Sequence, residues 1–304
     1  MNQFYVTQTD LTDVEQRELV AASDRNLEKR MEEVAKQVVS SPSLRLIGLT
    51  GPTCSGKTTT AKLLTKVLEE QGRRVHVISI DDFYYDKEVL QRRAELDPNI
   101  EVDYDSEDTI DVELLEEKAN SLLSGKETRM PRFDFHSGAR VDGLTVTPKP
   151  DDVFLFEGIQ ILYPRVDEIL RRQDYRSIYI CPTSSIRIGE EEFDSNEIRL
   201  MRRLVRDYLY RSTDPDFTFY VWQSVRDNEE KSIFPYAHFC NYFIDSTMPY
   251  EIGMLKPYLQ RILALIPPEG RYYEQAKEIL RQLSRVQPIP SAYMSPNSLY
   301  KEFI

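Results

Sequence analysis

The sequence predicts an α/β protein with a parallel central sheet that has helices on both faces. Short apolar runs alternate along the chain with longer segments in which apolar residues recur at helical spacing. That alternation is typical of strands joined by helical crossovers, which form parallel sheets. The first run, "LRLIGL" at 44–49, has the composition of a buried strand. We therefore expect a sheet that is covered on both sides.

Residues 1–42 are predicted to form an N-terminal helical extension. Thr12 and Glu15 have the spacing of a capping box, in which each residue satisfies a backbone N–H group of the other. Apolar residues then recur at helical spacing, and the run Ser40-Ser41-Pro42 ends the helix. We expect this extension to pack on the body of the protein or on a second subunit.

The body is predicted over 43–266, and residues 267–304 are predicted to form a C-terminal helix and a tail that pack on it. Strands are expected at 44–49, 75–80, 153–156, 176–180 and 242–245. Helices are expected at 57–71, 111–124, 164–172, 195–212, 217–230, 251–266 and 271–286. The tail after them is rich in Pro and Ser, which indicates a strap over the surface.

The composition is typical of a soluble globular protein of the cytoplasm. Of its 304 residues, 30% are charged and 40% hydrophobic, and no run reaches the roughly 18 apolar residues of a membrane span. The N-terminus lacks the basic and apolar regions of a signal peptide. Cys54, Cys181 and Cys240 are odd in number and widely spaced, which argues against disulfides and for a reducing compartment. A net charge of -12 disfavours nucleic acid as a partner.

The segment "GPTCSGKT" at 51–58 matches the pattern GxxxxGK[ST] of a phosphate-binding loop. A predicted strand precedes it and a predicted helix follows it, which is the context that this loop requires. Backbone N–H groups and the positive end of the helix dipole would hold phosphates there. Lys57 is expected at the β- and γ-phosphates, and the Thr58 hydroxyl at Mg²⁺. We therefore predict the P-loop NTPase fold rather than a chance glycine-rich turn, with these nucleotide-binding residues: Gly51, Pro52, Thr53, Cys54, Ser55, Gly56, Lys57, Thr58 and Thr59.

Carboxylates follow two of the predicted strands. Asp81 and Asp82 come after the strand at 75–80, and Glu157 comes after the strand at 153–156. In open α/β sheets, ligands bind at the carboxyl ends of the strands. A carboxylate there could bind Mg²⁺ or accept a proton from an attacking hydroxyl group. The alternatives are a helix-capping role for either aspartate and a solvated strand end for Glu157.

The segment "RLMRRLVRDYLYR" at 199–211 predicts a helix with clustered arginines. Arg199, Arg202, Arg203 and Arg206 fall largely on one side of it. Such a cluster is unusual in a chain with a net charge of -12. A lid that closes these arginines over ATP would neutralise charge on the transferred phosphoryl group and exclude water. The alternative is a solvated basic face that pairs with the acidic run at 190–192.

Together these segments resemble the phosphoribulokinase/uridine kinase family of P-loop kinases. The resemblance runs over 44–265 and rests on the blocks "GPTCSGKTT", "SIDDFYYD", "FEGI" and "RLMRRLVRDYLYRS". Two weaker blocks, "YDSEDTID" and "MPRFDFHSGAR", agree in position with the family's ribose and nucleobase segments. The chain looks closer to a bacterial uridine kinase-like subgroup, which shares segments similar to "SVRDNEEKSIFPY". The resemblance implies that Mg²⁺ and ATP are used to phosphorylate a small-molecule hydroxyl, the 5′-hydroxyl in nucleosides.

The resemblance also implies roles for individual residues. Asp81, rather than Asp82, falls on the family's catalytic aspartate. The implied catalytic residues are Asp81, Lys57 and Arg202, with Arg202 and Arg206 joining the loop at the nucleotide. The implied Mg²⁺ ligands are Thr58, Asp81 and Glu157. The implied acceptor-binding residues are Asp81, Tyr84, Asp105, Phe133, His136, Arg140 and Arg199.

The segment expected over a nucleobase departs from the family pattern. Uridine–cytidine kinases usually read Tyr-Asp-Phe-x-x-His-x-Arg, whereas this chain has Phe133 and Gly138 in place of the tyrosine and the histidine. Val221 stands where a base-contacting glutamine is expected. A site that reads a base by hydrogen bonds discriminates through such polar groups. The resemblance predicts a nucleoside as the acceptor, and the missing polar groups leave a sugar phosphate, pantothenate or glycerate as the alternative.

Two other classes of function fit the sequence less well. A regulatory protein that binds ATP without turnover is disfavoured because Lys57, Thr58, Asp81 and Glu157 are all present. A GTPase is disfavoured because we find no Asn-Lys-x-Asp motif for guanine. We therefore predict an enzyme with a small-molecule partner and without nucleic acid or membrane partners, and leave homo-oligomerisation open.

Overall fold

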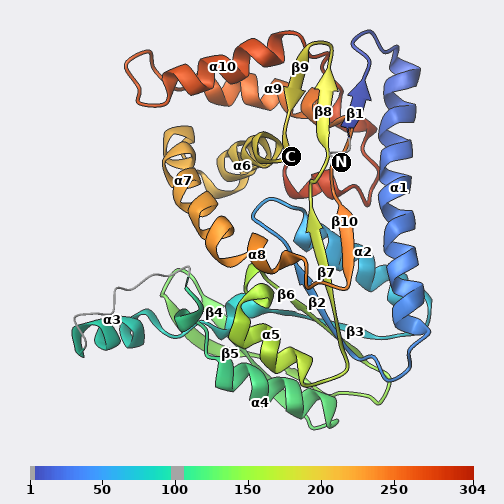
Figure 1. The fold of residues 1–304 in the computed structure, drawn as a ribbon, viewed down its shortest axis with the longest axis vertical. Coiled ribbons are helices and arrows are strands. Elements are labelled where there is room, and N and C mark those ends of the chain that lie inside the picture. The colour runs from blue at the N-terminus through green and yellow to red at the C-terminus, as the bar shows by residue number, and fades with distance from the viewer. Residues whose placement is uncertain (1–3, 97–105) are drawn as a thin grey trace.

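The computed structural model describes residues 4–96 and 106–304 and has a five-stranded parallel sheet at its centre (Figure 1). The strand order is β10-β7-β2-β6-β3, and all neighbouring pairs are parallel. The strands are β2 (Leu46–Thr50), β3 (Val75–Ser79), β6 (Val153–Glu157), β7 (Tyr175–Cys181) and β10 (Tyr242–Asp245). The predicted class is confirmed, because these strands fall at the five predicted places.

Both faces of this sheet are covered by helices, which form two hydrophobic cores. Successive residues of a strand point to opposite sides and so contribute to different cores. Along β6, Val153 and Leu155 pack in one core, whereas Phe154 and Phe156 pack in the other. The first core also contains side chains of α1 (Asp13–Val39), α2 (Lys57–Glu70), α6 (Ser195–Arg211) and α9 (Glu251–Leu263). The second contains side chains of α4 (Val112–Leu123) and α5 (Pro164–Arg171).

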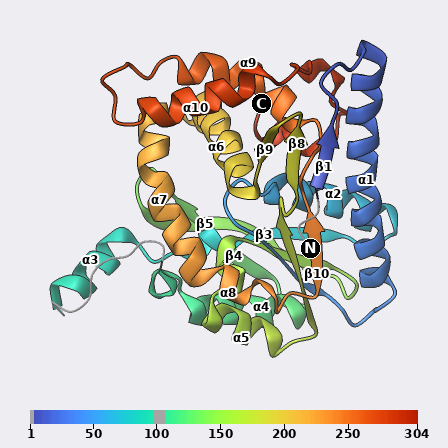
Figure 2. The same ribbon diagram turned by 45° about the horizontal axis from the view of Figure 1, so that its top comes forward.

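Four more helices complete the described part of the chain. They are α3 (Lys87–Leu96), α7 (Pro215–Ser232), α8 (Phe234–Ala237) and α10 (Tyr273–Ser284). Figures 1 and 2 show α6, α7, α9 and α10 grouped at one end and α4 and α5 at the other, with α1 running along the side. The seven predicted helices of the body and C-terminus are confirmed, whereas α3 and α8 were not expected. None of the described helices is long and apolar enough to cross a membrane.

The N-terminal segment corrects the prediction of a purely helical extension. Phe4–Thr7 forms strand β1, which pairs in parallel with β8 (Ser185–Ile188). A third strand, β9 (Glu191–Phe193), completes this small sheet. Helix α1 then begins with the predicted capping box and ends at Ser40. The strand was missed because it is short and its pairing partner lies far along the chain.

A hairpin of β4 (Thr128–Asp134) and β5 (Ala139–Val146) was also not predicted. Its turn is closed by the Gly138 N–H group, which donates to the Asp134 carbonyl at 2.8 Å. Gly138 has a φ of 68°, a conformation that residues with side chains rarely adopt. The segment expected over a nucleobase is therefore the tip of this hairpin.

The C-terminal tail is packed more deeply than a surface strap. It follows α10, passes α1, where Ser295 and Ser298 bond to the Asp24 carboxylate, and reaches the turn Leu299–Glu302 beside α2. Leu299 is 1% exposed and Tyr300 0%. The tail thus belongs to the same core as the sheet, and the predicted boundaries at 42/43 and 266/267 stay predictions.

Candidate active site

The segment between β2 and α2 curls around the first turn of α2. Gly56 is the N-cap of this helix, with a φ of 96°, and it has no side chain that could cap the first N–H groups. Lys57 starts the helix, and its Nζ donates to the carbonyl oxygens of Gly51 at 3.0 Å and Pro52 at 3.1 Å. The loop therefore holds a positive ammonium group beside the positive end of a helix dipole, a combination that attracts anions.

The sheet register brings two of the predicted acids to this loop. Glu157 ends β6 and lies opposite Leu49 of β2 and Ser79 of β3. Asp81 follows β3 in the 3-10 turn Ile80–Phe83. Burial raises the pKa of both carboxyl groups, and the Lys57 ammonium acts against that rise in both. Two buried carboxyl groups and one ammonium thus share a site at the carboxyl ends of adjacent strands.

Gln160 is part of this site, although the sequence did not single it out. Its side chain is 1% exposed, and Nε2 donates to Oδ1 of Asp81 at 2.6 Å and to the hydroxyl of Tyr84 at 2.8 Å. A Cβ on Gly158 would come within 2.5 Å of Oε1 of Gln160, so the glycine makes room for this amide. Its position two residues after Gly158, next to the "FEGI" block, was the available signal.

The donor set fits Mg²⁺ in combination with a phosphate. Within residues 4–96 and 106–304, no group of three or more His, Cys, Asp or Glu side chains could hold a metal ion alone. Protein sites usually hold Mg²⁺ by one or two carboxylates together with substrate phosphates and waters. The Asp81 charge, after burial itself, raises the pKa of Glu157, so a cation beside these two acids would relieve their repulsion. Thr58, the third predicted ligand, lies on the first turn of α2 with its side chain exposed.

Arg199 lies behind the phosphate loop in an ion pair with Glu229 of α7. Its side chain is 0% exposed, and its two terminal nitrogens are 2.6 and 2.8 Å from the Glu229 carboxylate oxygens. It also donates to the Thr53 carbonyl at 3.3 Å, while the Thr53 N–H group donates to Glu229 at 3.1 Å. The pair therefore holds both backbone groups of one loop residue.

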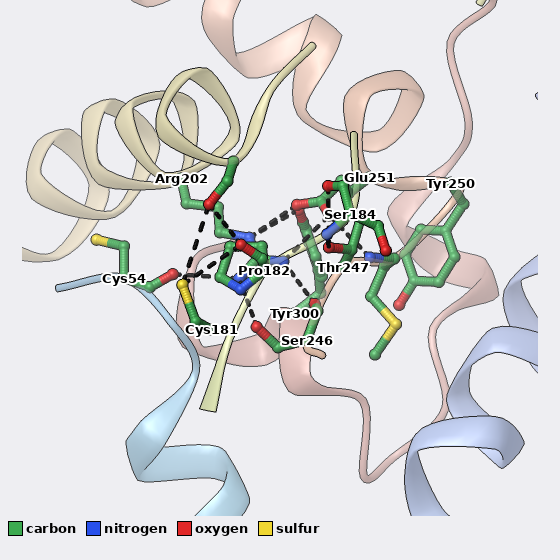
Figure 3. A network of polar contacts seen from close by, with 12 residues as sticks. Cys54, Cys181, Pro182, Ser184, Arg202, Ser246, Thr247, Tyr250, Glu251 and Tyr300 are labelled. Atoms are coloured by element: carbon green, nitrogen blue, oxygen red, sulfur yellow. Dashed lines mark hydrogen bonds and ion pairs between the residues drawn. The ribbon is translucent and has the colours of Figure 1, made fainter. Parts of the chain in front are cut away.

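Arg202 makes the equivalent contact with the next residue of the loop. Figure 3 shows its guanidinium group between Cys54 on one side and Glu251 and Tyr300 on the other. It donates to the Cys54 carbonyl at 3.1 Å and to the Glu251 carboxylate at 2.7 and 3.1 Å. The Tyr300 hydroxyl donates to the same carboxylate. This buried network joins α6, the loop, the start of α9 and the C-terminal tail.

These placements differ from both sequence interpretations of the arginine helix. Arg199 and Arg202 are buried and paired with Glu229 and Glu251, so they form neither an open lid nor a solvated face. Arg206 is partly buried and pairs with Asp207 of its own helix. In the acidic run at 190–192, Glu191 pairs with Arg281 of α10 and Glu190 with Arg285 just after it. Glu192 pairs with Arg187 of β8. Helical spacing showed that the arginines share a side, but their carboxylate partners come from distant helices.

An aromatic cluster lies next to Asp81. The rings of Tyr84 and Phe133 are 5.6 Å apart, and that of Phe135 is 5.1 Å from Phe133, both pairs meeting edge to face. Asp82 holds the hairpin in this position, because its Oδ1 accepts the Phe133 N–H group at 3.0 Å. Asp82 thus orients the hairpin, and the three rings offer an apolar surface beside the Asp81 carboxylate.

The other predicted acceptor residues lie around the same hairpin or outside the described part. Arg140 donates to the Asp111 carboxylate at 2.9 Å, and its backbone N–H bonds to Asp86. His136 is an exposed residue whose backbone N–H bonds to Asp134 within the turn. Asp105 lies outside the described residues. The structure therefore gathers Asp81, Tyr84 and Phe133, with Arg140 and His136 at the edge of the hairpin.

Two cavities flank the arginine helix and the phosphate loop. One, of about 420 Å³, lies between the start of α2 and the C-terminal tail, where its lining includes Thr58, Thr59 and Lys62. The other, of about 810 Å³, lies between α6, α7 and α10 and has the aromatic side chains of Phe219, Tyr220, Trp222 and Tyr272 in its wall. Of these two cavities, only the smaller one is lined by residues of α2.

Comparisons with known proteins show which proteins this chain is similar to. A model of the phosphoribulokinase/uridine kinase family matches residues 46–247. A uridine kinase of Lactobacillus helveticus is 29% identical over 171 residues, 56% of this chain and 71% of the relative. A uridine-cytidine kinase B of Dictyostelium discoideum is 32% identical over 178 residues, 59% of this chain and 64% of the relative.

A solved structure is similar in fold. A putative fructose transport system kinase from Silicibacter sp. TM1040 aligns with a TM-score of 0.53 at 21% identity, covering 70% of this chain and 98% of that one. At this identity the likeness concerns the fold. The two termini of the present chain, residues 1–45 and 248–304, lie outside the family match.

Proposed function

Because this chain belongs to the phosphoribulokinase/uridine kinase family, we propose that it transfers the γ-phosphate of ATP to the 5′-hydroxyl of a nucleoside. The observation that carries the proposal is the grouping of Lys57, Asp81 and Glu157 around the first turn of α2. In this group, the Lys57 ammonium attracts phosphate and the Asp81 carboxylate offers a base. The uridine kinase relatives support a nucleoside as the acceptor.

The residues divide the reaction between them. The acceptor oxygen attacks the γ-phosphorus, the bond to the β,γ-bridging oxygen breaks, and the hydroxyl proton passes to Asp81. Oδ1 of Asp81 already accepts a hydrogen bond from Gln160, so the other oxygen is the one that faces the acceptor. Lys57 lies where it can neutralise charge on the phosphates.

Thr58, Asp81 and Glu157 are the residues that would hold Mg²⁺ together with the nucleotide. When bound there, the ion neutralises charge on the phosphate oxygens. Both Asp81 and Glu157 have a pKa that burial raises, which makes a nearby cation favourable.

The aromatic cluster of Tyr84, Phe133 and Phe135 supports a flat acceptor such as a nucleobase. The tyrosine and histidine that usually bond to the base are replaced here by Phe133 and Gly138. Tyr84, Phe133 and Phe135 offer ring surfaces next to Asp81 on which a nucleobase can pack. The hairpin turn requires a positive φ at position 138, which explains why a glycine stands there in place of the family's histidine. A nucleoside is therefore held more by ring contacts than by hydrogen bonds to its base, and we expect discrimination between bases to be weak.

A panel of acceptors tests this proposal. We expect ADP and a nucleoside 5′-monophosphate to form from ATP, Mg²⁺ and at least one of uridine, cytidine, adenosine and guanosine, identified by mass spectrometry. Ribose 5-phosphate, pantothenate and glycerate serve as the alternative acceptors. Product from one of these alone would replace the nucleoside by that metabolite. Binding of ATP without any product would favour the regulatory protein.

A further inference from the structure

The C-terminal tail packs directly against the phosphate loop. A Cβ on Gly56 would come within 2.5 Å of the Leu299 side chain, so this leucine packs directly on the helix N-cap. Tyr300 lies under the Arg202 guanidinium group, and Phe303 is fully buried next to it. These anchors fix the turn that carries Glu302, and they lie outside the region that the family model matches.

The Glu302 carboxylate lies at the N-terminus of α2, the helix that follows the phosphate loop. Its Oε2 accepts the backbone N–H group of Thr59 at 3.1 Å. Thr59 is in the first turn of α2, where N–H groups have no partner within the helix. In a phosphate-binding loop, the N–H groups of this turn cradle the phosphates of the nucleotide. Glu302 thus uses a donor that the nucleotide also uses.

The surroundings of Glu302 fit an anion that can be exchanged for phosphate. Burial raises the pKa of Glu157 most, the Lys57 ammonium group lowers it, and the charges of Asp81 and then Glu302 raise it further, so Glu302 and Glu157 lie close enough to repel. The adjoining cavity of about 420 Å³ has Lys62, Lys66 and Lys301 in its wall. Three lysines around a cavity of this size suit an anionic ligand of the size of a nucleotide.

We propose that residues 296–302 form one wall of the nucleotide site and that the Glu302 carboxylate competes with the nucleotide phosphates for the first turn of α2. Since Leu299, Tyr300 and Phe303 are buried, the backbone stays in place and the side chain of Glu302 turns away when ATP binds. The competition lowers the affinity for ATP. The proposal rests on the proposed function only in that the ligand of the loop is ATP.

Two variants of Glu302 test this competition. Glu302→Ala removes the carboxylate, and Glu302→Gln removes its charge while keeping an oxygen. Calorimetry with a non-hydrolysable ATP analogue and Mg²⁺ should show Kd falling about three- to tenfold in Glu302→Ala, with a smaller fall in Glu302→Gln. Glu69→Gln, the same change at the exposed far end of α2, should leave Kd unchanged. An unchanged or higher Kd in Glu302→Ala, with a Tm like that of the wild type, overturns the proposal.

The measurement separates this proposal from the proposed function. It needs no acceptor, so failure of every nucleoside in the panel would remove the proposed activity and leave the competition standing. Tighter binding in Glu302→Ala supports the competition even where the wild type binds ATP too weakly to measure. If neither protein binds the analogue, both the competition and the use of ATP are wrong.

Discussion

At the scale of single residues, burial determines the chemistry of the acids at the sheet edge. Desolvation raises the pKa of Asp81 and Glu157, and this rise is opposed by the Gln160 hydrogen bond at Asp81 and by the Lys57 ammonium group at both acids. Asp82, next along the chain, is only partly buried and holds the hairpin backbone. Neighbouring aspartates therefore have separate tasks, one at the phosphate loop and one in orienting the hairpin.

Asp81→Asn should raise Tm while it abolishes turnover. A carboxyl group whose pKa is raised by folding destabilises the fold at any pH above its pKa in the unfolded chain, and pH 7 lies well above the ordinary aspartate value of 3.8. We expect a Tm higher by a few degrees at pH 7 without magnesium, and kcat lower by about 10²- to 10⁴-fold. The gain in Tm should shrink as the pH falls towards the raised pKa and wild-type Asp81 takes up its proton. A Tm difference that does not shrink between pH 7 and the ordinary aspartate value of 3.8 would contradict this reasoning.

Gln160→Met should lower kcat and leave the KM for ATP almost unchanged. The substitution keeps the volume of the side chain but removes the donor that fixes Oδ1 of Asp81. Loss of a hydrogen bond to a charged group costs about 1.5–3 kcal/mol, so initial rates should show kcat reduced roughly ten- to hundredfold. Gln223→Met, at an exposed glutamine of α7, is the control. An equal rise in KM would mean that Gln160 acts in binding ATP.

At the scale of elements, α6 connects the phosphate loop to the rest of the molecule. Arg199 ties Thr53 to α7 through Glu229, and Arg202 ties Cys54 to α9 through Glu251. A loop that must present several N–H groups to phosphate needs its carbonyls held from behind. The arginine helix supplies that support, whatever further contacts it makes with a nucleotide.

Glu229→Gln should destabilise the protein and weaken ATP binding together. Removing one partner of a buried ion pair leaves the other charge uncompensated, and we expect the free energy of unfolding, measured in urea, to fall by about 3 kcal/mol. The double variant Arg199→Met/Glu229→Met removes both charges and should recover most of that stability. Its affinity for ATP should stay low, because Thr53 has lost both partners. Full recovery of affinity would show that the pair is only structural.

At the scale of the whole molecule, helix α1 and the C-terminal tail pack against each other. Asp24 of α1 is 5% exposed and accepts hydrogen bonds from the Tyr250 hydroxyl at 2.9 Å, the Ser298 hydroxyl at 3.1 Å and the Ser295 N–H group at 3.2 Å. One carboxylate thus joins the N-terminal helix, the start of α9 and the tail. The same tail continues to Tyr300 and Glu302 at the phosphate loop.

Asp24→Ala should loosen the tail as well as α1. It removes the shared buried acceptor of the Tyr250 hydroxyl, the Ser298 hydroxyl and the Ser295 N–H group and leaves the two hydroxyls only their contact with each other at 3.1 Å, so we expect the free energy of unfolding to fall by about 2–3 kcal/mol. Hydrogen exchange followed by mass spectrometry should speed up in peptides that cover 13–39 and 295–303. Glu33→Ala, at an exposed position of the same helix, should change neither measurement. Faster exchange confined to 13–39 would show that the N-terminal extension does not brace the tail.

The sheet and its acids could be predicted because their signals are local. Buried parallel strands are short apolar runs, and "GPTCSGKT" specifies its own turn, so the positions of Lys57, Asp81 and Glu157 followed from the order of elements. Strand β1 was not predicted, and the tail was predicted to pack on the body but not to be buried so deeply, because both depend on partners more than a hundred residues away. Gln160 was missed because its place two residues after Gly158 is a weak signal, and its partners Asp81 and Tyr84 lie more than seventy residues away in the chain.

The sequence by itself determined the fold class, the family and the phosphate end of the site, because periodicity and motif spacing act over a few residues. The tertiary structure decided which carboxylate each arginine of α6 meets, since Glu229 and Glu251 come from other helices. It also decided that Glu302 lies on the first turn of α2. Such contacts depend on how distant segments fold back on the core, and the burial of Leu299, Tyr300 and Phe303 is the physical cause of the last one.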